Sequence, residues 1–152
     1  MKKIVIISDT HGNFSALEAL LPIMKESDYL FHLGDFQRDI KHYERELGDK
    51  VISVKGNCDG GGDDYITQID GVKIMLTHGD SYSVKWSLLK LKYKAKELGV
   101  NVVFYGHTHE ADILEEDGIF FINPGCMNKF TGKSYCYAVI TNGKIVPTIV
   151  YF

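Results

Sequence analysis

Short apolar runs, rich in β-branched side chains, alternate with polar segments along the first third of the chain. Residues 4–7, 29–33 and 50–54 are the first three such runs. The run at 4–7 is continuous in Ile and Val, which is typical of a central strand covered on both faces. Each run ends in a short polar or glycine-containing segment. The pattern therefore predicts three buried strands.

Helical signals occur between and after these strands. Apolar residues at helical spacing mark the first helix, namely Leu17, Leu20, Leu21 and Met24. A capping box at residues 15–18 predicts its N-terminus. The polar stretch 37–47 is interpreted as a second helix. Residues 84–98 carry one apolar face and precede Gly99, a typical C-cap, so they predict a third.

Hairpin signals dominate the rest of the chain. Three Asp-Gly or Asn-Gly pairs each separate two runs of strand length. The runs are 65–69 and 72–76, 112–115 and 119–122, and 135–141 and 144–151. Another apolar run, 102–105, stops at Gly106. Because strands and helices alternate early and hairpins follow, we expect an α/β protein with mixed sheets and helices outside.

Composition and charge narrow the class of protein. A chain of 152 residues with 45% hydrophobic composition fits one domain over residues 1–152. The net charge is −3 with scattered lysines, so nucleic acid is not indicated as a partner. No apolar run approaches the roughly 18 residues of a membrane span. Three widely spaced cysteines lack a disulfide or zinc-ribbon pattern, and we expect a cytoplasmic protein.

Polar side chains that bind metals follow five of the predicted strands. In an extended segment residues two apart point the same way, so His107 and His109 can address one small volume. Asp9 and His11 repeat this spacing. The full set is Asp9, His11, Asp35, Asn57, His78, His107 and His109. Strand ends are where ligands converge in α/β sheets, so coincidence is a poor explanation.

The chemistry of this set favours transition metals. Carboxylate, amide oxygen and imidazole together suit Mn²⁺, Fe, Ni²⁺, Co²⁺ or Zn²⁺ better than Ca²⁺ or Mg²⁺ alone. Seven ligands are too many for one catalytic ion. They suit two ions about 3.5 to 4 Å apart that share a bridging carboxylate.

The order of the motifs adds a resemblance. Asp-x-His, Gly-Asp, Gly-Asn, His-Gly and Gly-His-x-His follow one another as in the calcineurin-like metallophosphoesterases, over nearly the whole chain. The short length and the Gly-Asn-Cys-Asp sequence look most like the small bacterial and archaeal phosphodiesterase branch, to which the retromer scaffold subunit is also similar. The resemblance implies a four-layer α/β/β/α sandwich with two mixed sheets.

The resemblance also implies roles for the site residues. One metal would be bound by Asp9, His11 and His109, the other by Asn57, His78 and His107, and Asp35 would bridge them. Asp35, Asn57 and His78 would also be the catalytic residues. We expect two divalent transition-metal ions, Mn²⁺ or Ni²⁺ first, with Fe, Co²⁺ or Zn²⁺ as alternatives.

Two function classes follow. The first is a metal-dependent phosphodiesterase, in which a metal-bridging hydroxide attacks a small phosphodiester substrate in line. The alternative is a catalytically weak, protein-binding scaffold of the same fold, similar to the retromer subunit. A purely structural metal site is disfavoured, because such sites usually close their coordination with thiolates and histidines. The seven intact ligands favour the enzyme.

Residues beside the motifs have open roles. Many relatives carry histidine directly after the Asn, as a general acid or transition-state stabiliser, whereas this chain has Cys58. Asp59 either orients a neighbouring ligand or caps its own loop. His32 and His42 match no motif and are interpreted as ordinary packing or surface residues.

Overall fold

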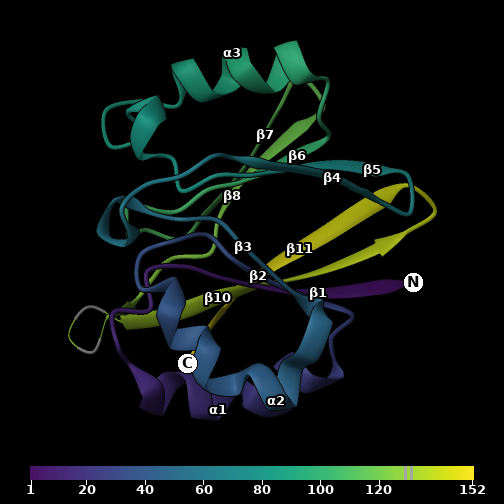
Figure 1. Cartoon of the computed structure of the whole chain (residues 1–152). Coiled ribbons are helices and arrows are strands. Elements are labelled where there is room, and N and C mark those ends of the chain that lie inside the picture. The colour runs from purple at the N-terminus through teal and green to yellow at the C-terminus, as the bar shows by residue number, and fades with distance from the viewer. Residues whose placement is uncertain (129, 131) are drawn as a thin grey trace.

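A computed structural model of the chain describes residues 1–128, 130 and 132–152, and it places two β-sheets face to face between layers of helices (Figure 1). Helices α1 (Phe14–Glu26) and α2 (Glu44–Leu47) lie on the outer side of one sheet, and α3 (Leu89–Leu98) lies on the outer side of the other. This is the four-layer α/β/β/α sandwich implied by the resemblance. The predicted fold class is confirmed.

The first sheet has the strand order β11-β10-β1-β2-β3, and β9 pairs with β10. Its strands are β1 (Lys2–Ile7), β2 (Tyr29–His32), β3 (Val51–Ser53), β9 (Met127–Asn128), β10 (Gly132–Thr141) and β11 (Lys144–Tyr151). β1, β2 and β3 are parallel, whereas β10 runs antiparallel to β1. The sheet is therefore mixed.

The second sheet has the order β4-β5-β6-β8-β7. Its strands are β4 (Tyr65–Ile69), β5 (Val72–Leu76), β6 (Val102–Phe104), β7 (Asp112–Glu116) and β8 (Ile119–Asn123). The three inner strands are parallel and the two edge strands are antiparallel to their neighbours. All three predicted hairpins are present, as β4–β5, β7–β8 and β10–β11.

The strand β1 shows how the sequence pattern builds the layers. Ile4 and Ile6 pack between the two sheets, against Phe31 and Phe104 among others. Val5 and Ile7 point the other way, into the cluster beneath α1. These four residues of β1 are fully buried, as the continuous apolar run predicted. The parallel strands of both sheets have their carboxyl ends at one edge of the sandwich.

The predicted start of the first helix is wrong. The N-cap is Asn13, whose side chain accepts a hydrogen bond from the Ala16 N–H at 3.2 Å, and Ser15 lies inside the helix. The Asn13 amide also donates to the Met127 carbonyl at 2.8 Å. A contact from the far end of the chain therefore helps to fix this terminus, and a local pattern does not report it.

The other two helices are shorter than predicted. Residues 37–47 form a 3₁₀ helix, Gln37–Tyr43, followed by the single turn of α2. The third helix begins at Leu89, because Asp80–Tyr82 forms a 3₁₀ turn and Ser83 is left-handed, with a φ of 55°. Among the described residues, no helix combines the length and the apolar character that crossing a membrane requires.

Candidate metal centre

The seven predicted side chains lie together in the loops that follow β1, β2, β3, β5 and β6. Donor atoms of Asp9, His11, Asp35 and His109 all lie within 4.8 Å of one another, and so do those of Asp35, His78 and His107. Asn57 joins the second group, since its Oδ1 is 2.9 Å from His78 Nε2. Asp35 is the member common to both groups. We call them the first and the second donor group.

The backbone brings the donors together by a different route from the one predicted. Five of the seven donors have a left-handed backbone, Asp9, His11, Asp35, His107 and His109, with φ between 47° and 71°. Non-glycine residues rarely adopt this conformation. The pairs two residues apart therefore sit in tight turns after the strands, not in extended segments. Such strain is characteristic of functional sites, where the surrounding structure holds it in place.

The Asp9 carboxylate is held with one oxygen free. Its Oδ2 accepts hydrogen bonds from Ser8 Oγ at 2.5 Å and from the His107 N–H at 3.2 Å. Its Oδ1 is buried and has no hydrogen-bond partner among the described residues, although His109 Nε2 lies 3.2 Å away. A Cβ at Gly106 would collide with the Ser8 hydroxyl, so a glycine is needed there. A buried, unpaired carboxylate oxygen is costly unless a cation meets it.

The second donor group collects acceptors around one point. His78 Nδ1 donates to the Leu33 carbonyl at 2.8 Å, so the Nε2 of the neutral ring carries a lone pair. That lone pair faces Asn57 Oδ1 at 2.9 Å, Asp35 Oδ2 at 3.5 Å and His107 Nδ1 at 3.1 Å. Carbonyl and carboxylate oxygens cannot donate to it. Acceptors turned toward one another in this way fit a bound cation, and both donor groups therefore fit divalent metals.

The protonation states of His107 and Asp9 suit metal binding. Burial lowers the pKa of His107, and the nearby Lys85 ammonium acts in the same direction. Burial opposes ionisation of Asp9, but contacts with His109 and Ser8 hold the pKa of this carboxyl below its ordinary value. The contact with Asp9 raises the pKa of His109, so this ring must give up any proton that it carries when it binds a metal. A neutral imidazole and an ionised carboxylate are the forms that bind a metal ion.

The roles of several residues that support the donors were not predicted from the sequence, or were left open. His32, interpreted as packing or surface, is fully buried and bonded to Thr10 and to Gly34. Asp59 caps its own loop, because its Oδ2 accepts the Gly56 N–H at 3.0 Å. The sequence offered one signal for such supporting residues, which is a polar residue between two ligands, as Thr10 is between Asp9 and His11.

Because His32 is buried, we expect the free energy of unfolding of the metal-free protein to depend on pH. Burial lowers its pKa to about 4, whereas the pKa in the unfolded chain is near 6.5. Between these values the unfolded state binds the extra proton, so the free energy of unfolding falls as the pH drops, by up to about 3 kcal/mol. The full stability is present above about pH 6.5. Urea unfolding of the metal-free protein at pH 7 and 4.5 measures this.

The control for that prediction is His32→Gln, which cannot titrate. This variant should lose the His32 part of the pH dependence and keep the parts due to other groups. The same decrease in both proteins would show that His32 is not the group responsible.

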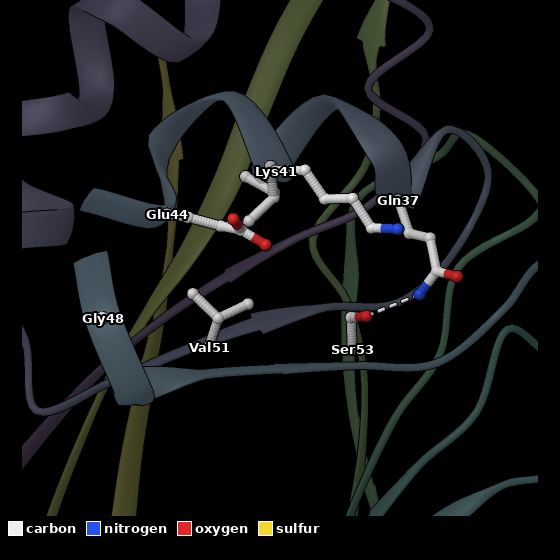
Figure 2. Close-up of a pocket in the computed structure, with 7 residues that line it drawn as sticks. Gln37, Lys41, Glu44, Gly48, Val51 and Ser53 are labelled. Atoms are coloured by element: carbon white, nitrogen blue, oxygen red, sulfur yellow. Dashed lines mark hydrogen bonds between the residues drawn. The ribbon is translucent and has the colours of Figure 1, made fainter. Parts of the chain in front are cut away.

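Cavity volume alone does not locate the donors. A cavity of about 290 Å³ is lined by residues between Gln37 and Ser53. Figure 2 shows these residues, among them the Gln37 amide that donates to Ser53 Oγ. The two atoms are 2.6 Å apart. None of the seven donors lines this cavity. Two other cavities, of about 270 and 280 Å³, adjoin His11 and His109 respectively, and residues of the β9–β10 segment line both.

Comparison with known proteins identifies the family. Residues 1–144 match the calcineurin-like phosphoesterase superfamily domain, and the chain belongs to this family. It is 32% identical to the probable metallophosphoesterase YsnB of Bacillus subtilis, over 98% of this chain and 89% of that protein. It is 34% identical to the phosphodiesterase MJ0936 of Methanocaldococcus jannaschii, over 86% and 87%. The predicted resemblance is confirmed.

One solved structure is similar to this chain in fold at low sequence identity. Vps29 from Entamoeba histolytica has a TM-score of 0.78 over 99% of both chains, at 21% identity. At this identity the likeness shows the fold alone. Membership of the phosphoesterase family implies divalent metal ions, and the two donor groups are the candidate ligands.

Proposed function

We propose that this protein is a dinuclear metal-dependent phosphodiesterase that acts on a small phosphodiester. The observation that carries the proposal is the pair of donor groups joined by Asp35. Asp9, His11 and His109 would hold one ion and Asn57, His78 and His107 the other, with Asp35 shared. Mn²⁺ and Ni²⁺ suit the mixture of oxygen and imidazole donors, with Fe, Co²⁺ and Zn²⁺ as alternatives.

The chain's own residues supply charge and rigidity. When bound, the two ions would activate a water and neutralise charge on the phosphoryl oxygens. Asp35 would compensate the positive charge of both ions, and the Cys58 N–H fixes its Oδ1 at 2.8 Å. The Leu33 carbonyl fixes the ring of His78. Asp35, Asn57 and His78 are therefore the residues that we assign to catalysis, because they lie together in the second donor group and would hold the ion beside the reacting phosphate.

A diester fits the surroundings of the donors. A phosphodiester carries a second organic group besides its leaving group, and the cavities beside His11 and His109 offer places for that group. The phosphodiesterase MJ0936 is among the relatives at 34% identity. A panel of phosphodiesters and phosphomonoesters with matched leaving groups tests this proposal. Faster turnover of monoesters would contradict it.

We predict that each chain binds two Mn²⁺ or Ni²⁺ ions. Seven donors in two groups exceed the needs of one ion. Titration calorimetry of the metal-free protein counts the ions. Saturation at a single ion, or none, would remove the dinuclear mechanism.

The second candidate function is a protein-binding scaffold of the same fold. The likeness to Vps29 gives it some support, although at 21% identity it concerns the fold alone. The two functions differ in a measurable way, because a scaffold needs no turnover. A protein that binds metals but hydrolyses neither diesters nor monoesters would favour the scaffold.

A further inference from the structure

His32 lies at the centre of a buried chain of hydrogen bonds between two donor loops. It is the last residue of β2 and is fully buried. Its ring contacts the Thr10 hydroxyl at 3.0 Å and the Gly34 N–H at 3.1 Å. Thr10 stands between Asp9 and His11, and Gly34 directly precedes Asp35. His32 therefore joins the loop after β1 to the loop after β2 without itself being a donor.

The direction of each hydrogen bond follows from chemistry. A backbone N–H only donates, so His32 Nδ1 is the acceptor for Gly34 and the proton of the neutral ring is on Nε2. That Nε2–H donates to Thr10 Oγ1. The Thr10 hydroxyl in turn donates to Asp39 Oδ2 at 2.7 Å. Burial lowers the pKa of His32 to about 4, which agrees with a neutral ring.

Asp39 closes the chain back onto the first loop. Its carboxylate is 3% exposed, and the same Oδ2 accepts the Gly12 N–H at 2.8 Å. Thr10 and Gly12 flank His11, so both neighbours of this donor are anchored through one carboxylate. Asp9 and His11 have φ of 52° and 47°, a conformation that persists only where the surroundings impose it.

We propose that His32 is a positioning residue for the metal centre, which holds the strained turn of Asp9 and His11 against the turn of Asp35 through the Thr10 hydroxyl and the Asp39 carboxylate. The inference rests on the proposed metal-dependent function. Partners behind metal ligands typically change metal affinity by about 10- to 100-fold when they are lost. The first donor group, which contains Asp9 and His11, should be the more sensitive of the two.

Two substitutions of His32 separate its two hydrogen bonds. In His32→Asn the side-chain oxygen can take the place of Nδ1 and accept from Gly34, but the side chain is too short to reach Thr10. In His32→Gln the amide nitrogen can take the place of Nε2 and donate to Thr10. We expect His32→Asn to weaken Mn²⁺ binding by about 10- to 100-fold and His32→Gln to change it by less than about threefold.

A second pair of variants leaves His32 in place. Thr10→Val removes the hydroxyl at constant size, and Thr10→Ser is its matched control. Thr10→Val should weaken Mn²⁺ binding as His32→Asn does, and Thr10→Ser should not. This pair decides the question if a His32 variant fails to fold. If His32 had only a structural role, His32→Asn and His32→Gln would weaken Mn²⁺ binding alike.

Amide hydrogen exchange provides a readout without metal. In the metal-free protein the Gly12 N–H should exchange about tenfold faster in Thr10→Val and His32→Asn than in their controls. Thr10→Val removes the hydroxyl that donates to Asp39, and His32→Asn removes the ring N–H that holds this hydroxyl in place. Unchanged Gly12 exchange and unchanged Mn²⁺ affinity in Thr10→Val would overturn the inference. If the unaltered protein binds none of Mn²⁺, Ni²⁺, Fe, Co²⁺ and Zn²⁺, the proposed function is wrong, and Gly12 exchange alone then decides whether His32 positions this turn.

Discussion

Asp35→Asn is expected to lower kcat for an activated aryl diester by about 10³-fold, and to lower it at least about tenfold more than His11→Ala does. Asp35 is the one residue that belongs to both donor groups. It is 3% exposed, so its charge acts where little water screens it. His11 belongs to the first donor group alone and is exposed. Its loss leaves three donors in that group and the second group complete.

The Asn substitution isolates charge from shape. The amide oxygen can still accept the Cys58 N–H that now binds Asp35 Oδ1. The loop after β2 should therefore keep its conformation while the charge between the two groups is lost. The measurement is kcat at saturating Mn²⁺ with bis(p-nitrophenyl) phosphate, accompanied by metal analysis of each protein.

Asp49→Asn is the matched control, because Asp49 is exposed and belongs to neither donor group. It should keep the activity of the unaltered protein. Equal activity in Asp35→Asn and the unaltered protein would show that Asp35 does not bridge. A larger loss of activity in His11→Ala than in Asp35→Asn would show that the first donor group matters more for activity than the shared carboxylate does.

The strands and the convergence of the donors could be predicted because their signals are local. The Asp-Gly and Asn-Gly pairs that set the hairpins have both central residues at positive φ, for example 45° at Asp70 and 83° at Gly71. The apolar run of β1 needs only its own residues to be identified as a doubly covered strand. Polar residues after parallel strands meet at one edge by the geometry of the sheet.

The helices and the supporting residues were harder to predict because distant contacts decide them. Asn13 contacts the Met127 carbonyl, 114 residues along the chain, besides capping α1. Asp39 bonds Thr10 and Gly12 in the loop after β1, and the segment around it is 3₁₀ instead of α-helical. The function of His32 depends on Thr10, 22 residues away. No periodicity or capping pattern contains these pairings.

Cys58→His is expected to narrow the difference in rate between aryl and alkyl diesters. Partial desolvation and the nearby Asp35 carboxylate raise the pKa of the Cys58 thiol above its ordinary value. Such a thiol is a poorer proton donor near neutral pH than an imidazolium with a pKa near roughly 6.5. An aryl leaving group departs as a stable anion without a proton, whereas an alkoxide does not. The unaltered protein should therefore hydrolyse aryl diesters much faster than alkyl diesters.

The position of Cys58 suits a residue that meets the leaving group. Its backbone N–H is bonded to Asp35, its Sγ is 4.0 Å from the Asn57 amide nitrogen, and its side chain is exposed beside the second donor group. An imidazole placed here could protonate an alkoxide as it leaves. General acid assistance is typically worth about 10²- to 10⁴-fold, and this is the upper bound on the gain for alkyl diesters.

Cys58→Ser separates proton donation from the other effects of the substitution. A hydroxyl is close in size to the thiol and is a still weaker acid, so the aryl-to-alkyl rate ratio should stay that of the unaltered protein if the thiol donates no proton. Metal analysis of Cys58→His is required, because the larger ring lies near Asn57 and can displace an ion. If Cys58→His retains both ions and the ratio does not fall, proton supply to the leaving group does not limit alkyl diesters. A lower alkyl rate in Cys58→Ser would instead show that the thiol already acts as the acid.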